Sequence, residues 1–220
     1  MFKQALAISK KDFYSEIRTR YAVNALAMFV IVVISIIKFS LGEEKIGSEL
    51  NAGLLWIIIF FSNSSGLSRV FTSEEERGTS LVLKLTSESK AILLGKLIFN
   101  TTLTFIINLL IVLLYVLITD LTINSPGLFI LTIILGNFGL SSVLTIIAAL
   151  ISKSSSKGTL YPVLSFPLLL PFMLAAINAT WLTIEGTSFS GVSGEFQIII
   201  SYTIVIITAS FMLFDVIWND

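Results

Sequence analysis

The chain has 220 residues, of which 55% are apolar and only 13% are charged, and this composition excludes an ordinary soluble domain. The absence of Cys and His excludes disulfides, thiolate metal sites and the commonest metal, haem and general-base ligand. No G-x-x-x-x-G-K-[ST] loop is present, so any ATP would be bound by another chain. The zero net charge says little about partners, and no nucleic acid partner is expected.

Residues 1–20 are predicted to form an amphipathic helix on the inner leaflet of a membrane. At about 100° per residue, Phe2, Leu6, Phe13 and Ile17 share one narrow sector, and the basic residues lie mostly on the other side. The apolar sector would enter the acyl boundary while the cations face anionic headgroups. An ordinary cytoplasmic flank that only follows the charge rule is the alternative. No cleavable signal is expected, because a polar-rich stretch precedes the first long apolar run.

Six apolar runs follow, each long enough to cross a hydrocarbon core of about 30 Å at a rise of about 1.5 Å per residue. Backbone amides in lipid must be satisfied within their own segment, and no run alternates like a barrel strand. We therefore predict an all-α, polytopic membrane protein in which one integral membrane domain fills residues 1–220. The predicted spans are about 21–41, 50–71, 91–119, 128–152, 160–180 and 196–218.

The positions of the basic residues predict the orientation. If the N-terminus lies in the cytoplasm, only Lys38 and Lys45 of the 14 Lys and Arg residues lie on the outer side. Cytoplasmic loops of membrane proteins carry an excess of Lys and Arg. We therefore expect both termini to be cytoplasmic.

The second predicted span begins with an apolar block and turns polar at Ser62-Asn-Ser-Ser-Gly66. Small and hydroxylated residues allow helix backbones to approach closely and to hydrogen-bond across the contact. This pattern favours a helix-packing face near the cytoplasmic end. A polar path through the membrane is the alternative.

A charged loop and a short half-apolar stretch separate the second span from the third. Gly78 permits a tight turn, and a short amphipathic helix starting at Thr79 would carry Leu81, Val82 and Leu85. Ser87 or Ser89 would then cap the long helix of the third span. A short rigid helix behind the three carboxylates of residues 74–76 fits a groove of a cytoplasmic subunit, and a solvated loop is the alternative.

The fifth predicted span contains three prolines, Pro162, Pro167 and Pro171. Each removes a backbone donor and clashes with the preceding turn, so the helix is predicted to be kinked or locally unwound at these positions. The freed carbonyls would face a neighbouring helix or, as the alternative, a cavity.

Several stretches resemble those of a known transporter family. The pattern Phe71-x-x-Glu74-x-Glu76-x-Gly78-Thr79, followed by a short apolar helix and by Ile92-Leu-Leu-Gly-Lys96, resembles the cytoplasmic coupling segment of ABC-2 type transporter permeases. Within that superfamily the chain resembles the haem exporter protein B family (CcmB) of cytochrome c maturation. Members of that family have this length, six spans, a basic N-terminal helix and no nucleotide-binding domain.

The resemblance extends over nearly the whole chain. It includes the acidic residue and basic cluster between Leu6 and Arg20, the proline-bearing fifth span, and the ending from Phe211 to Trp218. One departure is that family members commonly have acidic or amide residues just after the coupling glycine and a Pro soon afterwards. Here those places hold Leu81, Val82 and Ser87.

The resemblance implies a non-catalytic permease subunit of an ABC transporter in the bacterial inner membrane. Its implied partners are an ABC ATPase subunit that binds the ATP, other cytochrome c maturation membrane proteins and a haem chaperone. Haem would be a transported or handled ligand, and this chain itself would bind no cofactor. The implied ATPase-coupling residues are Phe71, Glu74, Glu75, Glu76, Gly78, Thr79, Leu81 and Leu85.

Two other functions fit the same sequence. One is an ABC-2 permease that exports a drug, a lipid or a polysaccharide. The other is a membrane scaffold without transport, which anchors other subunits and need not alter ATP turnover by any of them.

Overall fold

The computed structural model describes residues 1–19, 21–42, 46–67, 70–71, 74, 78–152 and 157–219. Every regular element within these ranges is a helix, so the all-α prediction is confirmed. The helices are α1 (Phe2–Thr19), α2 (Tyr21–Leu41), α3 (Ser48–Leu67), α5 (Ser80–Thr86), α6 (Ser89–Thr119), α7 (Pro126–Ser152), α8 (Lys157–Glu185) and α9 (Phe189–Asn219).

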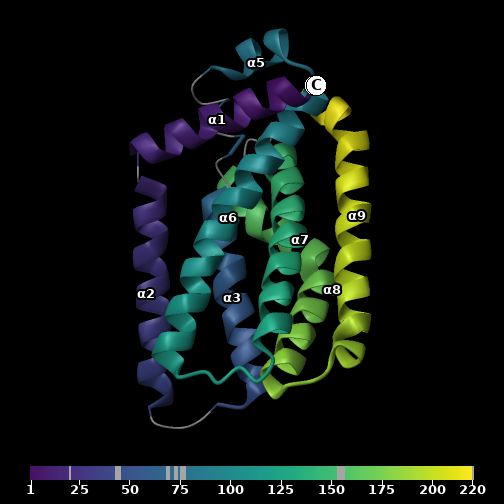
Figure 1. Cartoon of the computed structure of the whole chain (residues 1–220). Coiled ribbons are helices and arrows are strands. Elements are labelled where there is room, and N and C mark those ends of the chain that lie inside the picture. Colours follow the sequence, from purple (N-terminus) through teal and green to yellow (C-terminus); the bar gives the residue numbers. More distant parts are fainter. Residues whose placement is uncertain are drawn as a thin grey trace.

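The long helices form one bundle, and the two remaining helices lie at a single end of it. Figure 1 shows α2, α3, α6, α7, α8 and α9 running along the same direction, with α1 crossing their upper ends and α5 above α1. The C-terminus lies at this same end. We refer to it as the α1/α5 end.

Five of the described helices are long and apolar enough to cross a membrane: α3, α6, α7, residues Ser165–Glu185 of α8, and α9. The first predicted span corresponds to α2, whose described apolar segment, Leu26–Ser40, is shorter. Figure 1 nevertheless shows α2 extending along α6 for much of the bundle. A polytopic membrane protein is confirmed, and the crossing of the membrane by α2 stays a prediction.

Several helices differ from the predicted spans at their ends. Helix α3 ends at Leu67 within the described residues and not at residue 71, since Val70 and Phe71 lie in a turn in which the amide of Val70 donates to the carbonyl of Leu67 (3.2 Å). Helices α6, α7, α8 and α9 begin earlier than the predicted spans, and α8 also ends later. The apolar runs mark only the lipid-facing lengths of these helices, since their polar first and last turns are helical too.

The interior of the bundle is built around α7. This helix packs against α3, α6, α8 and α9 and is buried along most of its length. Close packing is possible because a Cβ on Gly136 would lie 2.2 Å from the ring of Trp56, and one on Gly139 would lie 2.2 Å from the ring of Phe172. Helix α9, in contrast, buries few of its side chains within the chain, as expected for a helix that faces lipid.

The opposite end of the bundle is closed by short connections. Helix α6 ends at Thr119 and is capped by Asp120, which has a left-handed backbone (φ 54°), and Pro126 occupies the first position of α7. The amides of Asn124 and Ser125 donate to the last turn of α8, at distances of 3.2 and 3.1 Å. These bonds join the α6–α7 connection to α8.

Candidate functional site

The predicted short amphipathic helix is present as α5 and lies at the α1/α5 end. Helix α5 exposes Leu81, Val82 and Leu85, whose exposed fractions are 65%, 57% and 80%, while Leu83 points inward. The short helix therefore presents an apolar surface away from the bundle. We name Leu81, Val82 and Leu85 the outer face of α5.

Gly78 has the backbone conformation predicted for a tight turn before α5. Gly78 has φ 68°, in the left-handed region that glycine adopts at no steric cost, and Thr79 is the residue that precedes α5. The predicted contacts Glu75 and Glu76 lie outside the described residues. The helix of the third span is capped neither by Ser87 nor by Ser89, because Glu88 occupies the N-cap position and Ser89 donates instead to Asp215 of α9.

Glu74 lies before α5 and, unlike the residues of the outer face, is buried. Its side chain is buried, and its carboxylate receives hydrogen bonds from Lys11 of α1, from Lys96 of α6 and from the hydroxyl of Thr79. The amide of Thr79 also donates to the backbone carbonyl of Glu74, at 3.0 Å. Glu74 therefore fixes the turn that leads into α5, from the inside.

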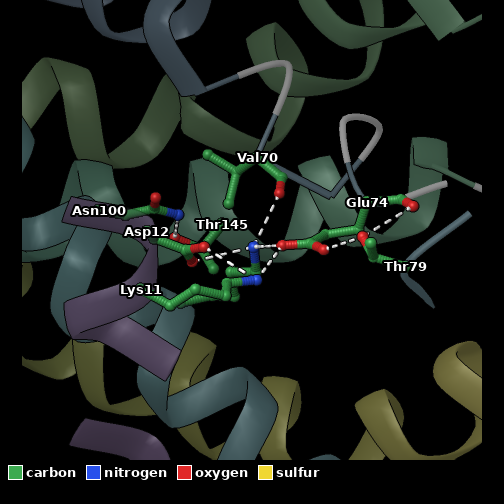
Figure 2. Close-up of polar contacts among 8 residues, drawn as sticks. Lys11, Asp12, Val70, Glu74, Thr79, Asn100 and Thr145 are labelled. Atoms are coloured by element: carbon green, nitrogen blue, oxygen red, sulfur yellow. Dashed lines mark hydrogen bonds and ion pairs between the residues drawn. The ribbon is translucent and has the colours of Figure 1, made fainter. Parts of the chain in front are cut away.

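Lys96 is the centre of this arrangement, although it lies in the third predicted span. Its Nζ is 2.9 Å from Oδ2 of Asp12, 3.0 Å from Oε1 of Glu74 and 3.1 Å from the carbonyl oxygen of Val70 (Figure 2). Lys11 also pairs with Asp12, at 3.3 Å. Lys11, Asp12, Glu74 and Lys96 carry two positive and two negative charges, and we call these four residues the ionic cluster.

The cluster shifts the acidity of its members. Burial by itself would raise the pKa of Glu74, but the charge of Lys96 and the hydrogen bonds from Lys11 and Thr79 prevail and lower the pKa to about 2. Burial by itself would lower the pKa of Lys11, whereas Glu74 and Asp12 raise it above the ordinary lysine value. Both residues are therefore charged at neutral pH.

Aromatic rings join α9 to the same end of the bundle. The ring of Phe71 lies 5.7 Å from Phe214 and 5.9 Å from Trp218, between ring centroids, and Phe214 stacks on Trp218. The Lys96 amine lies 5.7 Å from the centre of the Phe71 ring, and Lys84 of α5 lies 5.8 Å from that of Trp218. Phe71 is therefore a packing residue inside the chain, fully buried between α6 and α9.

A stripe of neutral polar side chains continues from the cluster into the bundle. Lys96, Asn100, Thr104 and Asn108 follow one another at intervals of four along α6, and all are buried. Asn100 donates to Thr145 of α7, at 2.8 Å (Figure 2).

The lower part of this stripe connects three helices. Asn63 of α3 donates to Asn108, at 2.8 Å, and Asn108 donates to Asn137 of α7, at 3.0 Å. Ser62 and Ser64 beside Asn63 are buried as well. The polar end of the second predicted span therefore serves helix packing, as the sequence favoured.

Helix α1 packs against the bundle with both apolar and charged side chains. Ala5, Ile8 and Asp12 are buried, while Leu6 and Ile17 of the predicted apolar sector remain exposed. Phe13 is the exception in that sector, since its ring lies edge-on to Phe99 of α6 at 4.9 Å. The exposed part of the sector is available to a membrane surface, and that contact stays a prediction.

The proline-bearing helix is continuous. Helix α8 runs from Lys157 to Glu185 without an interruption at Pro162, Pro167 or Pro171, so the local unwinding allowed by the sequence does not occur. The hydroxyl of Tyr202 in α9 donates to the carbonyl of Leu168, one residue after Pro167. This contact places a backbone carbonyl of the proline segment against a neighbouring helix.

Sequence reasoning did not find the role of Lys96 or Asp12. From the sequence, Lys96 is only one of the basic residues expected on the cytoplasmic side. Asp12 is only the acidic residue of the N-terminal stretch that resembles the family. A signal was present, because an ionisable residue inside an apolar run is costly unless it is paired. The identity of the partners required the fold, since Asp12 and Glu74 are far from Lys96 in the sequence.

The described residues contain no group of acidic side chains arranged to hold a metal ion. In comparisons with known proteins, residues 3–215 match the family model described as CcmB protein. No curated protein matches the chain.

Proposed function

The chain belongs to the CcmB protein family, and from this premise we propose that it is the non-catalytic permease subunit of a haem-exporting ABC transporter that acts in cytochrome c maturation. In this proposal a separate ATPase subunit binds and hydrolyses ATP. The observation that carries the proposal is the outer face of α5, which exposes three large apolar side chains on a helix held from within. The family match over nearly the whole chain supports the rest.

The outer face of α5 has the properties of a docking surface for a helix-binding groove. Exposed apolar side chains on a short, positioned helix provide anchors that a partner buries without first ordering the segment. Leu83 and the Thr79–Glu74 bonds hold the helix, so little conformational freedom is lost on binding. We therefore assign Leu81, Val82 and Leu85 as the ATPase contact, and Glu74 and Phe71 as the supports beneath it.

The connection between α5 and α6 gives a route for force. Only Ser87 and Glu88 separate the two helices, and Ser87 ends α5 with its amide donating to Leu83. A push on α5 when the ATPase closes would therefore reach α6 directly. Helix α6 extends through the full thickness of the bundle, and it would carry the displacement to α3 and α7.

The proposal places the protein in the bacterial inner membrane with the α1/α5 end in the cytoplasm. The distribution of basic residues supports this orientation. Other cytochrome c maturation membrane proteins and a haem chaperone would then meet the bundle or its opposite end. Haem is proposed as the handled ligand, with ATP on the partner and no cofactor resident in this chain.

The docking surface is tested by copurification of the ATPase from membranes. The variant Leu81→Asp/Leu85→Asp should insert normally but retain far less ATPase than the wild-type chain. The matched control is Thr122→Asp, an exposed position at the opposite end, which should retain the wild-type amount. Equal retention by both variants would contradict docking through α5.

Accessibility to a membrane-impermeant thiol reagent tests the orientation, because the chain has no native cysteine. In spheroplasts, a cysteine at Ser188 should react and a cysteine at Thr86 should not. The reverse pattern would place the α1/α5 end outside and would exclude a cytoplasmic ATPase at α5.

A further inference from the structure

The charge of Lys96 is held by three separate parts of the chain. Its amine donates to the carbonyl of Val70 and to the carboxylate of Glu74, and it forms an ion pair with the carboxylate of Asp12 of α1, all within 3.1 Å (Figure 2). The side chain is only 2% exposed. Water therefore has little access to replace any of these partners.

Helix α1 is fitted closely to α6 beside this lysine. A Cβ on Gly95 would lie 2.7 Å from the carbonyl oxygen of Ala5 and 2.9 Å from Cβ of Ile8, so the two backbones touch there. The Phe13–Phe99 contact lies one turn further along α6. The Asp12–Lys96 ion pair is thus flanked by close packing, which fixes the position of α1 against α6.

The contact path continues from Lys96 to α5. Glu74 accepts from Lys96 with one carboxylate oxygen and from the Thr79 hydroxyl with the other. The carbonyl of Thr79 accepts the amide of Leu83, which closes the first turn of α5. Continuous polar contacts therefore lead from the docking helix through Lys96 to α1.

We propose that Lys96 is a positioning residue that makes α1, the start of α5 and α6 move as one body when the ATPase acts on α5. This proposal rests on the proposed function and extends it from α5 and α6 to α1. Separation of any one element would leave a buried charge without its partner, which is strongly unfavourable. A displacement of α5 is therefore transmitted to α1 as well as along α6.

The test must separate coupling from folding. Removing Lys96 alone strands two carboxylates, so Lys96→Met is expected to loosen the α1/α5 end. The triple variant Asp12→Asn/Glu74→Gln/Lys96→Met removes the charges together, and replacement of a whole buried ionic group is often tolerated. Lys11 remains half-exposed and can be hydrated. The matched control is Lys90→Met, which removes an exposed lysine from the first turn of α6.

The first readout is the distance between spin labels on Lys10→Cys of α1 and Thr86→Cys of α5, both exposed positions in a chain without native cysteine. In the wild-type complex the distribution of this distance should have one narrow peak, and the peak should not move when ATP binds. In the triple variant it should broaden or shift on ATP binding. A distance in the triple variant that stays as narrow and constant as in the wild type would overturn the proposal.

The second readout is mature c-type cytochrome formed per ATP hydrolysed. For the triple variant we expect a loss of about ten-fold in this ratio, within the usual range of coupling between sites. The ratio counts only the ATP hydrolysed by the retained ATPase, so a change in ATPase retention does not affect it. The single variant Lys96→Arg should lose less of this ratio than the triple variant, because the charge at position 96 is kept. Lys90→Met should behave as wild type. If the triple variant is stable and fully coupled, the inference about Lys96 is wrong, and the proposed function is unaffected. A wild-type chain that retains no ATPase contradicts the proposed function and this inference together.

Discussion

The two ends of the bundle each contain an ion pair between distant residues, but the environments differ. At the α1/α5 end, Lys96 is buried and has three partners. At the opposite end, Lys38 pairs with Asp120 at 3.2 Å, with side chains that are 43% and 83% exposed. Water screens the second pair and stabilises its members separately, so only the first pair is expected to hold elements in place.

This contrast assigns different roles to the two ends. The α1/α5 end combines buried charges, stacked rings and α5, the helix that we propose as the docking surface. The opposite end is closed by backbone bonds, such as those from Asn124 and Ser125 to α8, together with exposed polar contacts. Among the described residues, an assembly of buried charges suited to receive force therefore lies at the α1/α5 end, where we propose that the ATPase binds.

The largest expected effect comes from breaking the ionic cluster. Lys96→Met should lower the free energy of unfolding in detergent by about 3–5 kcal/mol, because it leaves Asp12 and Glu74 buried without their shared partner. Lys38→Met at the other end should cost less than about 1 kcal/mol. Denaturant titration of both variants measures the difference, and equal losses would refute the contrast between the two ends.

The next effect concerns the close contact of α1 with α6. Gly95→Ala should cost about 1–3 kcal/mol, because the added methyl group meets the backbone of Ala5 and forces α1 away. Gly127→Ala at the opposite end has open space and serves as the control. Unfolding of the two variants under the same conditions provides the comparison, and a harmless Gly95→Ala would show that α1 is not held tightly.

A smaller effect is expected from the neutral stripe inside the bundle. Asn108→Leu removes hydrogen bonds to Asn63 and Asn137, and such contacts between membrane helices contribute about 0.6–2 kcal/mol. The control Asn178→Leu changes an exposed asparagine of α8 and should have no measurable effect. If Asn108→Leu is as stable as the wild type, the stripe does not contribute to helix packing.

A further effect is a dependence on acid pH. The folded pKa of Glu74 is about 2 and its ordinary value is 4.5, so its stabilising contribution is present above about pH 4.5 and is lost as pH falls toward about 2. The stability deficit of Glu74→Gln relative to wild type should therefore shrink over that range. Unfolding measured at pH 7, 4.5 and 3 tests this, and a constant deficit would argue against ionised Glu74 in the cluster.

The sequence predicted much of this fold because long apolar runs have few alternatives in lipid. Five of the predicted spans correspond to helices long and apolar enough to cross a membrane. The short helix predicted after Gly78 and Thr79 is also found there, as α5. The end of α3 was missed because polar Ser and Gly residues continue a helix as well as end one. Only the Val70 turn in three dimensions distinguishes these outcomes.

The candidate site was predictable in position but not in its contacts. Leu81 and Leu85 were correctly placed on a short helix, since hydrophobic spacing within one turn is a local property. The partners of Lys96 depend on how α1 and the turn around Glu74 fold back on α6, which no local pattern encodes. The same applies to Phe71, whose sequence position suggested a partner contact and whose ring packs inside the chain.

Site-specific cross-linking at α5 tests the central claim most directly. A single photoreactive label on Leu85→Cys is compared with one on Thr122→Cys, in membranes that contain the complete complex and a chain with no other cysteine. The account predicts that the label at position 85 joins the chain to the ATPase and that the label at position 122 does not. An ATPase adduct from position 122, or none from position 85 while the complex is intact, would contradict docking through α5.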